Sequence, residues 1–209
     1  MRTLYIDTSS SYLYTGIVEN DILLSEIKKE FGHSLSEEAL PEIVSMFKNN
    51  NIRPDEIDKI IVVNGPGSFT GIRIGITIAK VYAWSLNIPI TTITSLEAMM
   101  LSSETNLPRV PMIDARRKYV FSAIYDNDNR QILKPQHIKI EDLKQKLQQL
   151  PDYMIISNDE IEDFNNTEKY NPNIIKIVKY FENKEGLNPH AVNPEYLKLT
   201  EAEESKLQW

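Results

Sequence analysis

Short apolar runs alternate with turn residues at the beginning of the chain. Segments 3–7, 13–19 and 22–27 are rich in β-branched and aromatic residues, and they are separated by the serines at 9–11 and by Asn20-Asp21. This pattern predicts three antiparallel strands joined as a meander.

Helical periodicity begins after the meander. Apolar residues recur at helical intervals from Ser34 to Lys48, and Ser34 has the spacing of a capping box to Glu37. Pro41 is expected to kink this helix or delay its first turns, because proline lacks an amide N–H. The run 60–63 has no polar alternation, which predicts a strand that is buried on both faces.

The next elements complete the first domain. A helix is predicted over 71–86, a strand over 90–93 and a short helix over 95–101. Three antiparallel strands followed by helix, strand, helix and strand is the order of a ribonuclease-H-like unit. We therefore place a first domain at 1–106.

The second half begins like the first. Residues 6–20 align without gaps with residues 113–127, and Ile, Asp, Tyr, Ile and Asn recur in register. Two unrelated hairpins are the alternative, but the aspartate at the end of both strands favours a duplication. A duplicated ribonuclease-H-like unit is the α/β architecture of actin and the sugar kinases, the ASKHA fold, in which two aspartate-ended hairpins face a nucleotide across a cleft.

The rest of the chain is expected to form a smaller second domain, 107–209, with an extended tail. It has a strand over 130–140, a helix over 141–150, a strand over 153–157 and a helix over 173–183. This half is too short and too polar for a full second domain, so we expect the second unit to be reduced.

A glycine-rich loop precedes the 71–86 helix. Three glycines and a proline within residues 65–71 constrain its backbone path. The loop lacks the Gly-Lys-Ser/Thr end of a P-loop, and its glycines miss the dinucleotide-binding spacing by one residue. The alternative to phosphate binding is a shaped turn that seats the helix against a sheet, with Ser68 or Thr70 as the N-cap.

The predicted cleft carries few groups suited to nucleotide chemistry. The first hairpin has no glycine, and Arg116 and Arg117 stand where small residues would let backbone N–H groups approach a phosphate. We therefore expect no catalytic residue and no cofactor in the isolated chain. The residues of this degenerate cleft are Asp7, Thr8, Ser9, Gly65, Gly67, Asp114 and Arg116.

No metal site is expected either. The three histidines are far apart in the sequence and do not form a His-x-x-x-His or His-Glu-x-x-His motif. Asp7 and Asp114 could together hold a cation, although an aspartate at a strand end more ordinarily bonds the adjacent turn. Ser68 is a poor candidate nucleophile, because its loop is not G-x-S-x-G.

Composition limits the cellular compartment and the kinds of binding partner that we expect. The 209 residues include no cysteine, and the N-terminus begins with a strand-like run rather than an apolar leader. No segment is apolar enough to span a bilayer, so we expect a cytoplasmic protein with no membrane partner. The net charge of −7 disfavours autonomous binding to nucleic acid, so we expect a partner to hold any RNA.

Three motifs together resemble the bacterial TsaB family, also called YeaZ. They are Asp7-Thr8-Ser9, Gly65-Pro66-Gly67-Ser68-Phe69-Thr70-Gly71-Ile72-Arg73-Ile74-Gly75 and Asp114-Ala115-Arg116-Arg117. The resemblance covers the first half and continues, more weakly, through Pro194-Glu195-Tyr196-Leu197. It implies a non-catalytic scaffold that binds the kinase-like enzyme TsaD, together with the ATPase TsaE. That complex threonylcarbamoylates adenosine in the anticodon loop of tRNAs that read codons beginning with A.

The resemblance also implies where a partner binds. TsaD uses a His-x-x-x-His metal motif, but residues 33–37 here read His-Ser-Leu-Ser-Glu, so that metal is not expected. In the family the two helices after the meander serve both a homodimer and the TsaD complex, and they correspond to 34–48 and 71–86. The interface residues inferred on these helices are Leu40, Ile43, Phe47, Arg73, Ile74, Thr77, Val81 and Trp84.

Two alternatives stay open. The chain could be an enzyme in its own right, a nucleotide-dependent transferase or a protease, with Asp7 and Asp114 beside Arg116 as its best feature. ATP or ADP could instead bind only within the complex, at a boundary shared with a partner.

Overall fold

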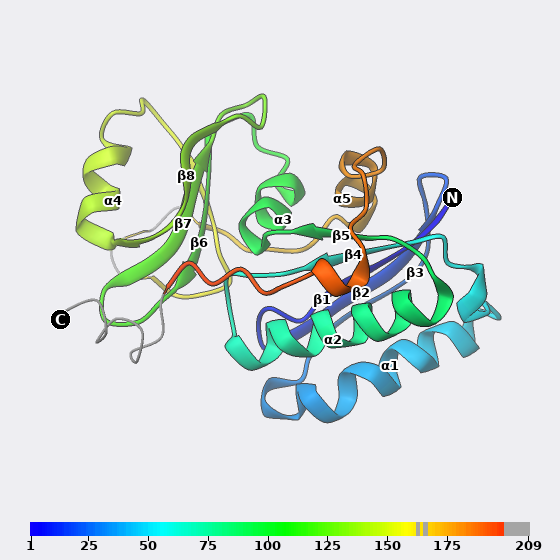
Figure 1. Cartoon of the computed structure of the whole chain (residues 1–209). Helices are drawn as coiled ribbons and strands as arrows, with labels where there is room; N and C mark the ends of the chain where they lie inside the picture. Colours follow the sequence, from blue (N-terminus) through cyan, green and yellow to red (C-terminus); the bar gives the residue numbers. More distant parts are fainter. Residues whose placement is uncertain (162–163, 165–166, 199–209) are drawn as a thin grey trace.

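Two five-stranded sheets carry the fold, and each belongs to one of two units that stand side by side (Figure 1). The computed structural model describes residues 1–161, 164 and 167–198. The first sheet has the order β3-β2-β1-β4-β5, with β1 (Arg2–Asp7), β2 (Tyr12–Glu19), β3 (Ile22–Glu30), β4 (Lys59–Val63) and β5 (Ile90–Ile93). The second sheet has the order β10-β9-β6-β7-β8, with β6 (Arg109–Asp114), β7 (Tyr119–Tyr125), β8 (Gln131–Lys139), β9 (Met154–Ile156) and β10 (Thr167–Glu168).

The two sheets share one topology. In each, three consecutive strands pair antiparallel, and the fourth strand pairs in parallel with the first, as β4 does with β1 and β9 with β6. The fifth strand then continues parallel to the fourth. The predicted duplication is therefore confirmed.

The second unit is reduced in its helices rather than in its strands. Its sheet is completed by the two-residue β10, which the sequence pattern did not predict. One helix, α4 (Ile140–Leu147), stands where the first unit has α1 (Leu35–Asn49). The ten residues between β9 and β10 are too few for a counterpart of the 18-residue α2 (Phe69–Leu86).

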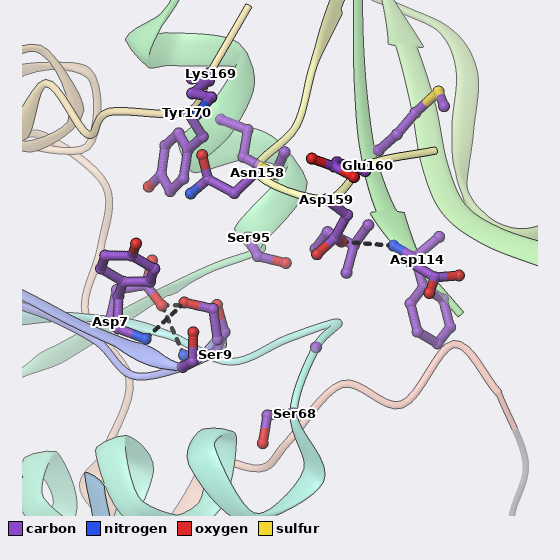
Figure 2. A pocket seen from close by; sticks show the side chains of 18 of the residues that line it. Asp7, Ser9, Ser68, Ser95, Asp114, Asn158, Asp159, Glu160, Lys169 and Tyr170 are labelled. Atoms are coloured by element: carbon purple, nitrogen blue, oxygen red, sulfur yellow. Dashed lines mark hydrogen bonds between the residues drawn. The ribbon is translucent and has the colours of Figure 1, made fainter. Parts of the chain in front are cut away.

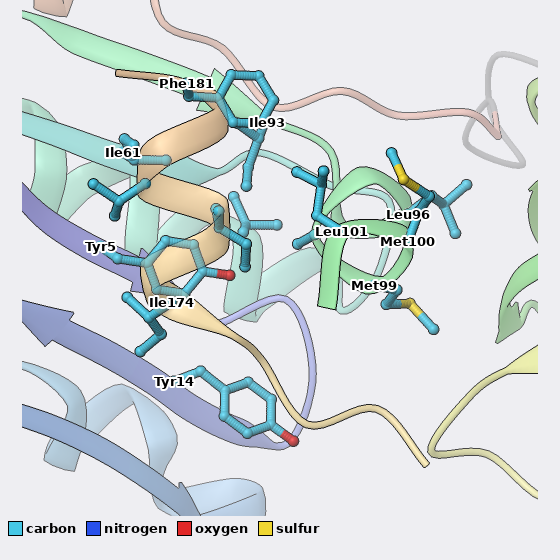
Figure 3. Packing of buried hydrophobic residues seen from close by; sticks show 14 of the residues in the cluster. Tyr5, Tyr14, Ile61, Ile93, Leu96, Met99, Met100, Leu101, Ile174 and Phe181 are labelled. Atoms are coloured by element: carbon cyan, nitrogen blue, oxygen red, sulfur yellow. The ribbon is translucent and has the colours of Figure 1, made fainter. Parts of the chain in front are cut away.

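Strand β4 is the buried centre of the first unit. All five of its residues are buried, as its unbroken apolar run predicts. Ile60 and Val62 pack with residues of α1 and α2, whereas Ile61 and Val63 pack with residues of α3 (Ser95–Ser102) and α5 (Ile174–Tyr180). Alternate residues of a strand point to opposite faces, so helices cover both sides of this sheet. Figure 3 shows the side that α3 and α5 cover.

The chain returns to the first unit after β10. Helix α5 packs against the first sheet, and the segment that follows it pairs Leu187 with Ile90 through backbone hydrogen bonds of 2.7 and 3.2 Å. Lys59, at the start of β4, is 4% exposed, and its ammonium group donates to three carbonyl oxygens just after α5 at 2.8–3.1 Å. The boundary after residue 106 stays a prediction, but α5 and residues 187–196 lie on the first unit.

The helices agree with some sequence predictions and correct others. Ser34 does not cap α1, because its hydroxyl donates to the carbonyl oxygen of Phe31 at 2.9 Å, so the predicted capping box is wrong. Helix α1 continues through Pro41 to its end. Ser68 caps α2 as predicted, since its Oγ accepts the N–H of Gly71 at 3.2 Å. Within the described residues, no helix is both long and apolar enough to cross a membrane.

Replacing Lys59 with methionine tests the anchor between β4 and the end of α5. The variant loses three hydrogen bonds and leaves partly buried carbonyl oxygens without a donor, so we expect the free energy of unfolding to fall by about 2–4 kcal/mol. Urea denaturation measures this loss. Lys179→Met is the control, because Lys179 is exposed on α5 and forms only a surface ion pair with Asp21, worth less than about 1 kcal/mol. Equal losses in the two variants contradict the anchoring role.

Candidate functional site

A cleft of about 730 Å³ lies between the two units (Figure 2). The β1–β2 hairpin, the glycine loop and the start of α3 form its wall on the first unit. The β6–β7 hairpin and the segment after β9 form its wall on the second unit. The structure thus brings most of the predicted cleft residues together. Those that line the cleft are Asp7, Ser9, Gly67, Asp114 and Arg116.

Sequence reasoning missed the part of the cleft that follows β9. Asn158, Asp159 and Glu160 come from the loop after β9, and Lys169 and Tyr170 follow β10. A polar run directly after an apolar strand could have indicated the loop, because sites of α/β sheets gather at the carboxyl ends of strands. Nothing in the sequence around Tyr170 marks it as a cleft residue.

The two hairpins contain the same aspartate turn. Asp7 Oδ1 accepts the backbone N–H of Ser9 at 2.9 Å, and Asp114 Oδ1 accepts the N–H of Arg116 at 2.8 Å. Asp114 also forms an ion pair of 3.3 Å with Arg116, and its N–H donates to Asp159 Oδ2 at 2.8 Å (Figure 2). Each carboxylate therefore bonds its own turn, which is the ordinary alternative to a cation shared between them.

The glycine loop lies directly against the first hairpin. The N–H of Ser68 donates to the carbonyl oxygen of Ser9 at 2.7 Å, and a Cβ at Gly67, where φ is +154°, would lie 2.2 Å from that oxygen. A Cβ at Gly71 would lie 2.0 Å from the carbonyl oxygen of Thr8, whose hydroxyl donates to Gly71 O at 2.7 Å. These glycines therefore permit a contact between two stretches of backbone.

This contact occupies groups that a phosphate would need. A helix N-terminus attracts anions through its unpaired N–H groups, but the N–H groups of Ser68 and Gly71 already have acceptors within the chain. Gly65 lies behind the cleft wall, where its carbonyl oxygen accepts the N–H of Ser95 at 2.9 Å. A Cβ at Gly65 would lie 2.6 Å from the carbonyl oxygen of Glu195. The loop thus acts as a packing element that seats α2.

Asp7 is the most deeply buried carboxylate of the cleft, at 2% exposure. Its Oδ1 accepts the hydroxyl of Ser9 at 2.7 Å, and the hydroxyl of Tyr5 donates to its Oδ2 at 3.4 Å. Burial raises the pKa of Asp7, and the hydrogen bonds from Ser9 and Tyr5 oppose that rise. Burial also raises the pKa of the phenols of Tyr5 and Tyr170, so both stay protonated beside Asp7 at neutral pH.

The cleft as a whole is acidic. The phosphates of a nucleotide would meet an excess of negative charge there, and the Arg116 guanidinium is already paired with Asp114. The residues present therefore do not fit a nucleotide in the isolated chain. In the part of the chain that the structure describes, no group of three or more His, Asp or Glu side chains is placed to hold a metal ion. The charged residues that line the cleft are Asp7, Glu30, Asp114, Asp159, Glu160, Arg116 and Lys169.

A second candidate site is the outer face of α1 and α2. Trp84 is 66% exposed, Val81 61% and Leu40 52%, which is high for large apolar side chains. Arg73 and Thr77 are also exposed on α2, and Ile74 is half-buried beside them. Six of the predicted interface residues thus lie at least partly on the surface.

Two other residues predicted on this face are buried instead. Ile43 is 2% and Phe47 is 4% exposed, and both pack in the core cluster that contains Ile60 and Val62 of β4. They occupy the inner face of α1, which the first sheet covers. In the isolated chain Ile43 and Phe47 are therefore core residues, and their contact with a partner stays a prediction.

The C-terminal segment extends the face at the start of α2. The Arg73 guanidinium lies 3.7 Å from the ring centroid of Phe69, and its Nε donates to the hydroxyl of Tyr196 at 2.9 Å. The rings of Phe69 and Tyr196 stack with centroids 5.1 Å apart. Sequence reasoning did not place Phe69 or Tyr196 there, because these positions are far apart along the chain.

Comparison with known proteins identifies the relatives of the chain. Residues 25–175 match the family model described as TsaD, tRNA N6-adenosine threonylcarbamoyltransferase. The chain is 31% identical to the tRNA threonylcarbamoyladenosine biosynthesis protein TsaB of Bacillus subtilis (strain 168) over 221 residues, covering 97% of this chain and 96% of that protein. An uncharacterised protein with similarity to peptidase YEAZ and a protein called YeaZ, both from Pseudomonas aeruginosa, have TM-scores of 0.78 and 0.75 at 16% identity, covering 94% of this chain and 99% of each. These structures confirm the predicted fold class.

Replacing Asp7 with asparagine tests the buried charge. The folded-state pKa of Asp7 is raised above its ordinary value of 3.8, so the ionised carboxylate destabilises the folded state above that raised pKa. This penalty disappears as the pH falls through the folded pKa. Asparagine keeps an acceptor for the N–H of Ser9 and carries no charge. We therefore expect Asp7→Asn to be at least as stable as the wild type at pH 7 and to lose its advantage on acidification.

Urea denaturation between pH 7 and pH 4 measures the stability of both proteins. A variant that is less stable at pH 7, with a deficit that shrinks at low pH, contradicts the raised pKa. That result would mean that the ionised form of Asp7 stabilises the fold.

Proposed function

Because the chain belongs to the TsaB (YeaZ) family and so acts in tRNA threonylcarbamoyladenosine biosynthesis, we propose that it is a non-catalytic scaffold or activator subunit. In this proposal it binds the kinase-like enzyme TsaD in the cytoplasm, and the ATPase TsaE joins the larger complex. The complex modifies adenosine in the anticodon loop of tRNA.

The observation that carries this proposal is the exposed apolar band on α1 and α2. Leu40 and Val44 are one helical turn apart on α1, and Val81 and Trp84 are one turn apart on α2. Each leaves between 42% and 66% of its surface exposed. The two helices are neighbours, so both pairs lie on one side of the molecule. Exposed apolar side chains that gather on one face mark protein-binding surfaces, and tryptophan is enriched among the residues that dominate such binding.

The same band suits two partners in turn. We propose that the isolated chain forms a homodimer through this face and that TsaD displaces the second copy to form a heterodimer. Arg73 and Thr77 are exposed on α2 beside the band, where they supply the polar rim that surrounds the apolar centre of a protein interface.

The cleft supports a non-catalytic role. The Ser9 hydroxyl bonds Asp7 and the Ser68 hydroxyl caps α2, so both have structural partners rather than a general base. No histidine lines the cleft within the described residues. We propose that ATP or ADP binds only at a boundary with a partner, whose groups complete a site that this chain lacks.

The variant Trp84→Glu places a carboxylate within the apolar band. We expect it to weaken association with TsaD by at least about 10-fold, because an unpaired charge is costly to bury in an interface. Size-exclusion chromatography with light scattering at micromolar concentration measures assembly. Ile132→Glu is the matched control, since Ile132 is 52% exposed on β8, in the other unit. The proposal fails if the wild-type chain forms no complex with TsaD, or if both variants weaken it equally.

The alternative is an enzyme that acts on its own, a nucleotide-dependent transferase or a protease. Asp7, Asp114 and Arg116 favour it, since all three line one cleft. Calorimetric titration of the isolated chain with ATP and Mg²⁺ separates the two functions. The scaffold proposal expects no binding at micromolar ATP, because carboxylates and an occupied glycine loop face the phosphates. A micromolar dissociation constant for the chain alone supports the enzyme instead.

A further inference from the structure

The negative charge of the chain is unevenly distributed. Residues 109–149 contain nine Lys and Arg against five Asp and Glu, a net charge of +4, whereas the whole chain has −7, so the remainder carries −11. This stretch runs from β6 to just beyond α4 and forms most of the second unit. A local positive region attracts a polyanion even when the average charge is negative.

Three of these cations form the β6–β7 turn. Arg116, Arg117 and Lys118 have φ angles of +67°, +53° and +64°, so three successive residues other than glycine are left-handed, and all three are exposed. Glycine or asparagine adopts this conformation with less strain. The aspartate bond to the N–H two residues on does not require it, because the first hairpin keeps that bond although residues 8–11 have no positive φ. We infer that these basic side chains serve to bind an anionic ligand.

The turn adjoins a groove of about 560 Å³ between β8 and α4. The carbonyl oxygen of Lys118 accepts the N–H of Ile140 at 3.0 Å, which places the turn beside the start of α4. Tyr119 follows the turn directly and pairs in register with Lys139 on β8. Tyr119, Lys139 and Lys146 line the groove together, so cations from the strand and the helix line it beside the basic turn.

The lining of the groove suits an RNA strand. Tyr119 stacks on His137 with ring centroids 4.5 Å apart, and Lys139 Nζ lies 5.9 Å from the Tyr119 centroid. The amides of Gln136, Gln145 and Gln149 also line the groove, with Asp142 as its acidic member. Ammonium groups bind phosphate oxygens, and amides bind ribose hydroxyls and base edges. The adjacent cleft, by contrast, has five carboxylates among the seven charged residues that line it.

We propose that the β6–β7 turn and the β8–α4 groove form an RNA-binding surface that contacts the sugar-phosphate backbone of the tRNA within the complex. This inference rests on the proposed function for the identity of the RNA. Because the rest of the chain carries −11, the surface gives the isolated chain little affinity, and it orients a tRNA that TsaD also holds.

The main test measures binding of an unmodified tRNA transcript to the assembled complex with TsaD at several salt concentrations. The groove variant is Lys118→Ala/Lys139→Ala/Lys146→Ala. The control variant, Lys28→Ala/Lys179→Ala/Lys184→Ala, removes the same charge from exposed positions on β3, on α5 and just after α5, all outside the 109–149 stretch. Both variants are first checked for assembly with TsaD.

We expect the groove variant to raise the dissociation constant at least about 10-fold and the control to change it less than about 2-fold. The slope of log affinity against log salt should become shallower by about 2 to 3 in the groove variant only, since each lost phosphate contact removes about 0.7–0.9. Equal affinities and slopes for the two assembled variants overturn this inference and leave the proposed function intact. Failure of the wild-type chain to assemble with TsaD overturns the proposed function itself.

The single substitution Lys118→Gly tests whether a loss of tRNA affinity comes from the lost charge or from a less stable fold. Lys118→Gly removes one cation and relieves one left-handed residue, so we expect the Tm to rise by about 2–4 °C while the tRNA affinity falls about 3-fold. A higher Tm with unchanged affinity contradicts a role for Lys118. Photo-crosslinking with 4-thiouridine tRNA gives a positional readout: crosslinks within 117–119 or 136–149 support the surface, and crosslinks confined to the cleft or to α1 and α2 overturn it.

Discussion

The contact between the glycine loop and the first hairpin is the constraint on which the first unit depends. The carbonyl oxygens of Thr8 and Ser9 lie where a Cβ at Gly71 and at Gly67 would be. No residue with a side chain at Gly67 or Gly71 permits that approach, so the backbones of the first hairpin and of the start of α2 are in direct contact, and the Thr8 hydroxyl adds a bond to Gly71 O. The position of α2 follows from this contact, and with it the exposure of Val81 and Trp84. A loop that resembles a phosphate cradle thus sets the geometry of the face that we propose binds a partner.

The second unit shows the same hairpin without that covering helix. Its aspartate turn repeats the hydrogen bond of the first, but the ten residues after β9 cannot supply an α2. Asp159 contributes a side-chain acceptor there instead, bonding the N–H of Asp114. A turn with no helix packed over it can carry exposed cations, whereas the first turn must keep Thr8 and Ser9 small and buried. The duplicated hairpin therefore packs against α2 in the first unit, and in the second unit it forms a charged, exposed surface.

The sequence predicted the features that depend on an internal repeat or on a regular pattern of apolar residues. The burial of β4 follows from an unbroken apolar run, and the duplication follows from the gapless match of 6–20 with 113–127. A strand of two residues, such as β10, is too short to show an alternation of apolar and polar positions, so the sequence pattern does not reveal it. The bond from Lys59 to the carbonyl oxygen of Phe181 joins positions 122 residues apart, and no local pattern reports such a contact.

The same limit applied to the candidate sites. Ile43 and Phe47 are as apolar as Leu40, and only the packing of α1 on the first sheet separates the inner face from the outer one. Asp7 and Asp114 were recognisable as equivalent positions, but their bonds to their own turns depend on backbone geometry that composition does not encode. Asn158 and Tyr170 reach the cleft through the path of the chain after β9, which carries no motif.

Average charge does not say where on the surface a polyanion would bind, because the field of a side chain acts over distances shorter than the molecule. At physiological salt the screening length is about 8 Å, so a phosphate senses the side chains nearest to it rather than the total of −7. The acidic cleft and the basic groove adjoin each other at the β6–β7 turn, where Arg116 lines the cleft and Lys118 bonds the start of α4. A polyanion near this turn is repelled on the cleft side and attracted on the groove side. In our proposals, the negative charge of the cleft disfavours the phosphates of a nucleotide there, and the positive charge of the groove favours an RNA strand along the outside of the second unit.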